Sequence, residues 1–219
     1  DRSPSRGLGD VYKRQGKTTL AKEISNMFTI PFISGSYSDL VPETRNERHE
    51  DMINKEPKII FEQDMQVLCK GRNAFNVTDT FVSDRSYIDS AAYIINKLSH
   101  RYPECEIDSF CNLCKALTKQ TTHIIFIPFS KNFMNHWEME DNNKRVLNRY
   151  YQFEVSQVIF GLLDLWGYRN KWSYCTNTVS DAGIITIEDK EIPILILDEL
   201  DFNNRVSIVR RFLKSTENL

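Results

Sequence analysis

The tetrapeptide Gly16-Lys17-Thr18-Thr19 carries the clearest chemistry in the sequence. It matches the second half of the phosphate-binding loop pattern Gly-x-x-x-x-Gly-Lys-Ser/Thr, in which backbone N–H groups turn toward phosphate oxygens. In that pattern Gly16 lets the backbone approach a phosphate, Lys17 places its ammonium on the β- and γ-phosphate oxygens, and Thr18 offers its hydroxyl to Mg²⁺. Apolar residues then recur at helical spacing, as expected where such a loop opens a helix. We therefore predict an ATP and Mg²⁺ site at these four residues.

The first half of the loop pattern is missing. Val11 stands five places before Gly16, where the pattern has glycine, and a β-branched residue lacks the backbone freedom that the loop needs. Residues 1–15 contain no apolar run that could form the strand before such a loop, and they resemble translated adapter sequence. We expect them to be non-native, with a genuine basic N-terminal arm as the alternative. The natural protein should then bind nucleotide, whereas the 219-residue chain should bind ATP weakly or not at all.

A second polar group, Asp84-Arg85, directly follows an apolar strand predicted at residues 80–83. Ligands of open α/β sheets bind at the carboxyl ends of the strands. A carboxylate at that place can hold Mg²⁺ or accept the proton of an attacking hydroxyl, and a guanidinium beside it can clamp a phosphate. Ser86 and Asp89 have the spacing of a helix capping box, so we predict a structural role for them.

Arg145 and Arg149 lie four residues apart at the start of a predicted long helix. They follow a polar loop, and together they indicate a lid around residues 130–149. Cations on a lid can close over a transferring phosphoryl group and stabilise its charge. The alternative is an ordinary solvated helix face.

Asp198-Glu199 ends an apolar run and resembles the Walker B signature of hydrolysing ATPases, in which the glutamate polarises water. Only twenty residues follow Glu199, fewer than the further strands of such ATPases require. We favour the end of a last strand, with Asp201 as the cap of a final helix. Cys111 and Cys114 fall within a predicted helix without a fourth ligand at zinc spacing, so we predict structural thiols there.

Strands alternate with helices along the whole chain, which predicts a three-layer α/β fold with a parallel sheet between helices. The predicted helices cover residues 17–28, 58–70, 86–98, 104–119, a long segment around 145–166, and 202–213. The predicted strands cover residues 30–34, 80–83, 122–128, 184–187 and 192–197. The length suits one domain, over residues 16–219, and the first strand of the fold should be missing or replaced.

The charge and composition of the chain limit the classes of partner that we expect. A net charge of −2 gives no electrostatic reason to expect nucleic acid or an anionic membrane as a partner. No apolar stretch approaches the roughly 20 residues that span a bilayer. Five cysteines without a disulfide-scaffold spacing suit a reducing cytoplasm. The sequence does not indicate an oligomeric state.

The order of these elements resembles the nucleoside and nucleotide kinase branch of P-loop proteins. More closely, the chain resembles phage and bacterial AAA-type ATP-binding proteins described as thymidylate-kinase-like, which are related to ribosylnicotinamide kinases. The resemblance rests on Gly16-Lys17-Thr18-Thr19, on the segment of residues 81–89, on the lid arginines, and on the final strand and helix through Asn204-Arg205-Val206.

The resemblance implies an Mg²⁺-dependent kinase that moves the ATP γ-phosphoryl group to a nucleoside or nucleoside monophosphate. Lys17 and Thr18 would bind the phosphates and Mg²⁺, and Asp84 would be the base or the carboxylate that organises Mg²⁺. Arg85 would clamp a phosphate, and the lid arginines would close over it. The acceptor would bind between residues 35–48 and the helix near Phe61. The weak candidates for acceptor contacts are Arg45, Arg48 and Gln63.

Three alternatives remain open from the sequence. They are a P-loop ATPase that uses Asp198 and Glu199, a ribosylnicotinamide kinase-like enzyme, and a nucleotide-binding module without turnover.

Overall fold

The computed structural model describes residues 16–42, 54–130, 133, 149–173 and 181–216. The helices in these ranges are α2 (Lys17–Phe28), α3 (Tyr37–Leu40), α5 (Pro57–Phe75), α6 (Tyr87–Leu98), α7 (Glu104–Thr118), α9 (Arg149–Leu165) and α10 (Phe202–Thr216). The strands are β1 (Phe32–Ile33), β2 (Val82–Ser83), β3 (Ile124–Phe126), β4 (Arg169–Ser173), β5 (Asp181–Ile187) and β6 (Lys190–Ile196). None of the described helices is long and apolar enough to cross a membrane.

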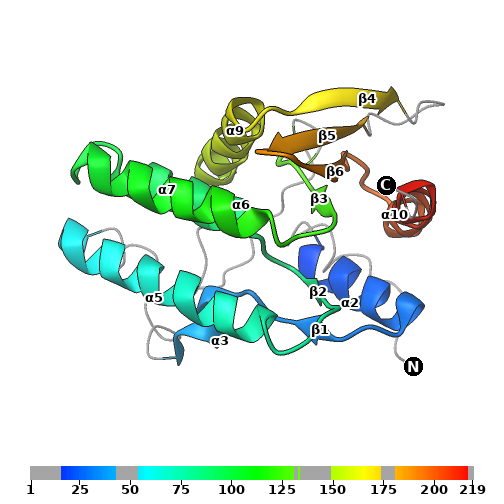
Figure 1. Cartoon of the computed structure of the whole chain (residues 1–219), viewed down its shortest axis with the longest axis horizontal. Helices are drawn as coiled ribbons and strands as arrows, with labels where there is room; N and C mark the ends of the chain where they lie inside the picture. Colours follow the sequence, from blue (N-terminus) through cyan, green and yellow to red (C-terminus); the bar gives the residue numbers. More distant parts are fainter. Residues whose placement is uncertain (1–15, 43–53, 131–132, 134–148, 174–180, 217–219) are drawn as a thin grey trace.

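The described strands form two sheets (Figure 1). β1 and β2 pair in parallel, with Phe32 opposite Val82. The second sheet has the order β3-β6-β5-β4, in which β3 and β6 are parallel and the other neighbours are antiparallel. The sequence predicts one parallel sheet, and the strand predicted to be missing or replaced falls on residues 1–15, outside the described residues.

The antiparallel part of the second sheet has a local cause. Only Glu188 and Asp189 separate β5 from β6, and Glu188 has a φ of 56°. A connection of two residues closes a hairpin, whereas a parallel pair needs a crossover of a dozen residues or more. β5 extends the strand predicted at residues 184–187, and β4 was not predicted.

Helices α2 and α6 begin and end as the sequence predicts. In α2, Leu20, Ala21 and Ile24 form the buried face. Helix α6 starts with a complete capping box between Ser86 and Asp89, because each residue's side chain bonds the backbone N–H of the other. The structural role predicted for this pair is therefore confirmed.

Helix α5 is longer than predicted. The sequence predicts its end at residue 70, directly before Gly71, but the helix continues to Phe75. Gly71 is therefore a buried residue within the helix and not its end, and an added Cβ there would make an ordinary contact of 3.6 Å with Leu40 Cδ1 of α3. Phe75 extends the apolar face of α5 and stacks on Phe81 with ring centroids 4.8 Å apart.

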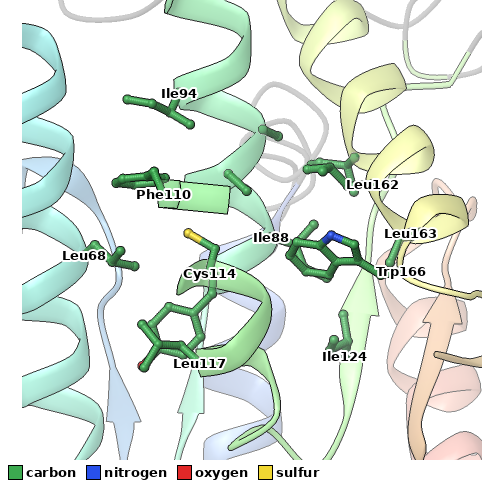
Figure 2. Packing of buried hydrophobic residues seen from close by; sticks show 14 of the residues in the cluster. Leu68, Ile88, Ile94, Phe110, Cys114, Leu117, Ile124, Leu162, Leu163 and Trp166 are labelled. Atoms are coloured by element: carbon green, nitrogen blue, oxygen red, sulfur yellow. The ribbon is translucent and has the colours of Figure 1, made fainter. Parts of the chain in front are cut away.

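The apolar core has two parts. The larger cluster fills the space between α5, α6, α7 and α9 and reaches β3, and Figure 2 shows side chains from each of these elements meeting there. The smaller cluster lies between α2, α10 and the strands β3 and β6, with Leu20, Phe129 and Phe212 as members. Val82 of β2 packs against the smaller cluster. This second cluster therefore fixes the start of α2 next to the end of β2, where the predicted phosphate residues lie.

Candidate phosphate site

Gly16 starts α2 in a conformation that favours glycine. It is the N-cap of the helix, with φ 65° and ψ 15°, and it is buried. This left-handed region is costly for residues with a Cβ. Gly16 provides no side-chain cap, and the first N–H groups of an α-helix have no partner within the helix. Free N–H groups and the positive end of the helix dipole together make a suitable anion site.

Thr18 and Asp84 are in direct contact, although they lie far apart in the sequence. The Thr18 hydroxyl donates a hydrogen bond of 2.6 Å to Oδ2 of Asp84. The other carboxylate oxygen, Oδ1, accepts a hydrogen bond of 3.0 Å from the Gly35 backbone N–H. The carboxylate thus joins the first turn of α2, the end of β2 and the loop after β1. Thr18 and Asp84 are the two residues that the sequence assigns to one Mg²⁺ site.

Gly35 is a residue of this site that the sequence did not indicate. An ideal Cβ at residue 35 would lie 2.6 Å from Cβ of Arg85 and 3.0 Å from Oγ of Ser83. Neither atom is the far end of a long flexible side chain, so the backbone would have to move. Glycine therefore allows the loop after β1 to reach Asp84. The close approach of the loop after β1 to Arg85 depends on the tertiary structure, and no local sequence motif predicts it.

Replacing Gly35 with alanine is expected to reduce the free energy of unfolding by about 1–3 kcal/mol, the usual cost of overpacking. Urea denaturation measures the change. Gly161→Ala in α9 is the matched control, because a Cβ there meets no atom within 4 Å. The control should be neutral or stabilise by up to about 1 kcal/mol, since alanine favours a helix. An equal loss in both variants would contradict the close approach.

Lys17 and Arg85 both face the carboxylate of Asp89. Oδ1 of Asp89 lies 3.4 Å from NH1 of Arg85 and 3.9 Å from Nζ of Lys17. NH1 of Arg85 also donates a hydrogen bond of 3.1 Å to the hydroxyl of Tyr93, and the guanidinium lies 5.4 Å from the centre of that ring. Asp89 and Tyr93 lie four residues apart on one face of α6, and Arg85, which precedes the helix, lies four residues before Asp89. This spacing of four is a signal in the sequence that could have revealed the group.

The charged residues of this group alter one another's pKa values. Burial lowers the pKa of Lys17 below its ordinary value, and the positive charge of Arg85 adds to the effect. Burial opposes ionisation of Asp89, but Lys17 and Arg85 outweigh it and lower the pKa of that carboxyl. The surroundings therefore stabilise the Asp89 carboxylate and disfavour the protonated form of Lys17. A phosphate beside Lys17 would favour its protonated form.

The donor set fits a magnesium nucleotide. Mg²⁺ prefers oxygen ligands and is commonly held by one or two protein groups together with substrate phosphates. The Thr18 hydroxyl and the Asp84 carboxylate supply such oxygens, and Lys17 stands beside them as the first residue of α2. No group of three or more His, Cys, Asp or Glu that could hold a metal occurs among the described residues, so a metal held by protein groups alone is not indicated for that part of the chain.

Other predicted site residues lie apart from this group or outside the described residues. Thr19 is exposed on α2, and Gln63 on α5 accepts a hydrogen bond of 3.2 Å from Lys55. Arg149 begins α9, but its side chain is outside the described part of the structure. The remaining candidates, which all fall outside the described residues, are Arg45, Arg48 and Arg145.

Asp198 and Glu199 follow β6, and their side chains contact different segments. Oδ1 of Asp198 accepts a hydrogen bond of 2.7 Å from the Ser130 hydroxyl. Oε1 of Glu199 accepts a hydrogen bond of 2.9 Å from the Asp201 N–H. Asp201 in turn accepts a hydrogen bond of 2.8 Å from the Asn204 N–H, which confirms it as a cap of α10. Asp198 thus joins the segment after β6 to the segment after β3, and Glu199 bonds the residue that caps the last helix.

The cysteines of α7 differ in exposure. Cys114 is buried in the larger core cluster, where burial raises the pKa of its thiol. Cys111 is partly buried and Cys105 is exposed. The predicted structural role therefore fits Cys114 best.

Comparisons with protein-family models, with curated proteins and with solved structures found no match for this chain. A function for the site has to be argued from its own residues.

Proposed function

We propose that this protein is an ATP- and Mg²⁺-dependent phosphotransferase that acts on a nucleoside or a nucleoside monophosphate. The observation that carries the proposal is the 2.6 Å contact between Thr18 and Asp84, beside the two cations Lys17 and Arg85. A hydroxyl, a carboxylate, a lysine and an arginine at a helix N-terminus are the groups that phosphoryl transfer requires. The resemblance to thymidylate-kinase-like proteins supports the same reaction, and the cysteine usage supports a cytoplasmic location.

The reaction follows from the position of these groups. An oxygen of the acceptor attacks the γ-phosphorus of ATP, the bond from that phosphorus to the β–γ bridging oxygen breaks, and ADP leaves with the electron pair. With a nucleoside acceptor, Asp84 can take the proton of the attacking hydroxyl, whereas a monophosphate brings an oxygen that is already deprotonated. Mg²⁺, when bound, neutralises charge on the β- and γ-phosphate oxygens.

The cations supply the remaining stabilisation. Lys17 would contact the β- and γ-phosphate oxygens from the first turn of α2, and Arg85, which approaches the same Asp89 oxygen, would clamp a phosphate beside it. Arg145 and Arg149 would add charge from a lid and exclude water when it closes. Without water at the γ-phosphoryl group, the acceptor is favoured over hydrolysis.

Measuring ADP formation with and without possible acceptors tests the proposal. Two proteins are compared: the 219-residue chain, and a version in which residues 1–15 are replaced by an apolar strand and a complete glycine loop. ADP formation is measured with ATP, Mg²⁺ and a panel of nucleosides, nucleoside monophosphates and nicotinamide riboside. We expect turnover in the repaired protein that depends on one nucleoside or monophosphate, and weak ATP binding or none by the original chain.

Three results would count against the proposal. Steady phosphate release without an acceptor would indicate an ATPase. Turnover only with nicotinamide riboside would move the substrate class to the ribosylnicotinamide alternative. A repaired protein that binds no nucleotide would contradict the assignment of the phosphate site itself.

A further inference from the structure

Asp89 does more than cap α6. Its Oδ2 accepts hydrogen bonds of 2.9 Å from the Ser86 N–H and 2.8 Å from the Ser86 hydroxyl, and this oxygen belongs to the capping box. Its Oδ1 points to different partners, because it lies 3.4 Å from NH1 of Arg85 and 3.9 Å from Nζ of Lys17. The two oxygens of one carboxylate thus serve two separate groups of contacts. A cap needs only the first.

We propose that Asp89 is a positioning residue, which holds Lys17 and Arg85 together as a two-cation clamp for the transferring phosphoryl group. The proposal rests on the proposed function, since it assigns a role within the same site. The capping role of Asp89 alone gives no reason for its contact with Lys17.

The position of Asp89 is rigid. Three hydrogen bonds join it to Ser86, since the Asp89 N–H also donates to the Ser86 hydroxyl at 3.5 Å. Only 17% of its side chain is exposed. A carboxylate fixed in this way can set the place of longer, more flexible cations, because lysine and arginine otherwise lose rotamer freedom when they are ordered.

The charges explain why such an anchor is needed. Lys17 faces Arg85 from the loop after β2, Asp84 from the same loop, and Asp89 and Tyr93 from α6. Arg85 and Lys17 repel each other, and their side chains are only 32% and 27% exposed, so water screens the repulsion incompletely. Asp84 is already bonded to Thr18 and Gly35. Among the residues that the structure describes, Asp89 is therefore the carboxylate that contacts both cations.

Titration of Lys17 in the full 219-residue chain tests the proposal without any nucleotide. Lysines are reductively methylated with ¹³C-formaldehyde, the Lys17 signal is assigned with Lys17→Arg, and its pKa is followed by NMR. We expect a lower Lys17 pKa in Asp89→Asn than in the wild type, because a neighbouring negative charge is lost. Asp89→Ser provides a second neutral variant that keeps a small polar group at this helix position.

Ser86→Ala is the matched control. It removes the hydroxyl of the capping box. It keeps the charge of Asp89 and the hydrogen bond that the backbone N–H of residue 86 donates to Oδ2 of Asp89. The Lys17 pKa should stay at its wild-type value in this control. An unchanged Lys17 pKa in both Asp89 variants, or an equal decrease in Ser86→Ala, would overturn the proposal. This holds whether or not the protein transfers phosphate, so the result is separate from the test of the proposed function.

Steady-state kinetics of the repaired protein, in which residues 1–15 are replaced, give the second readout. Asp89→Asn should lower kcat by about 10–100-fold, the usual effect of misplaced catalytic groups, while KM for ATP stays near its wild-type value. A merely structural role would instead lower stability in Asp89→Asn and Ser86→Ala alike and leave kcat of the folded protein unchanged. That result would also overturn the proposal.

Discussion

Replacing Asp84 with asparagine is expected to lower phosphoryl transfer by about 10²–10⁴-fold while ATP binding persists. Asparagine has nearly the same shape, and its carbonyl oxygen can still accept a hydrogen bond from Thr18 or Gly35, which both bond Asp84. The variant should therefore fold. It lacks the negative charge that would hold Mg²⁺ and the basic oxygen that would accept a proton. Initial rates of ADP formation and calorimetric titration with ATP measure the two properties separately.

Glu199→Gln is the matched control for this prediction. It is also a single carboxylate-to-amide change, and the side chain that it alters accepts a bond from the Asp201 N–H. Transfer should continue at close to the wild-type rate. If Glu199→Gln stops turnover and Asp84→Asn does not, the catalytic carboxylate lies beyond β6, and the protein is an ATPase.

Replacing Lys97 with methionine is expected to reduce the free energy of unfolding by about 3–5 kcal/mol. Nζ of Lys97 lies 2.9 Å and 3.0 Å from the two carboxylate oxygens of Asp64, and each side chain is only 8% exposed. Methionine fills a similar space but leaves a buried carboxylate without its partner. Burial already raises the pKa of Asp64. Without the lysine, the carboxyl should take up a proton more readily, so the loss should be smaller at acidic pH.

Urea denaturation at neutral pH measures this loss, and a double variant provides the control. Asp64→Leu combined with Lys97→Met replaces the whole pair by apolar groups and should recover most of the stability. A single variant that costs less than about 1 kcal/mol would indicate that the pair is exposed to water. The ion pair would then not join α5 to α6 in the way that the distances indicate.

Local signals predicted the helices around the site. Helix α2 follows from apolar residues at helical spacing, and the start of α6 follows from the spacing of Ser86 and Asp89. These patterns depend on neighbours within a few residues, so they can be read without knowing the fold. The strand ends that carry the polar groups were likewise visible, because Asp84 directly follows a short apolar run.

Contacts between distant segments were not visible in the same way. Nothing near Gly35 shows that its backbone must pass beside Arg85, and nothing near Asp89 shows that it faces Lys17. The capping box alone explained the presence of Asp89 in the sequence. The contact of the same side chain with Lys17 and Arg85 was therefore not predicted. The strand β4 was missed because its sequence of arginine, asparagine, lysine, tryptophan and serine lacks the alternation of a half-buried strand.

A structure of the repaired protein with Mg²⁺ and a non-hydrolysable ATP analogue tests the central claim most directly. We predict Mg²⁺ about 2.0–2.1 Å from the Thr18 hydroxyl oxygen, as its coordination requires, with the Asp84 carboxylate bound to the ion or to one of its waters. The γ-phosphate should contact Lys17 and Arg85. A nucleotide whose γ-phosphate and metal instead lie against Asp198 and Glu199, away from Asp84, would contradict the proposed site.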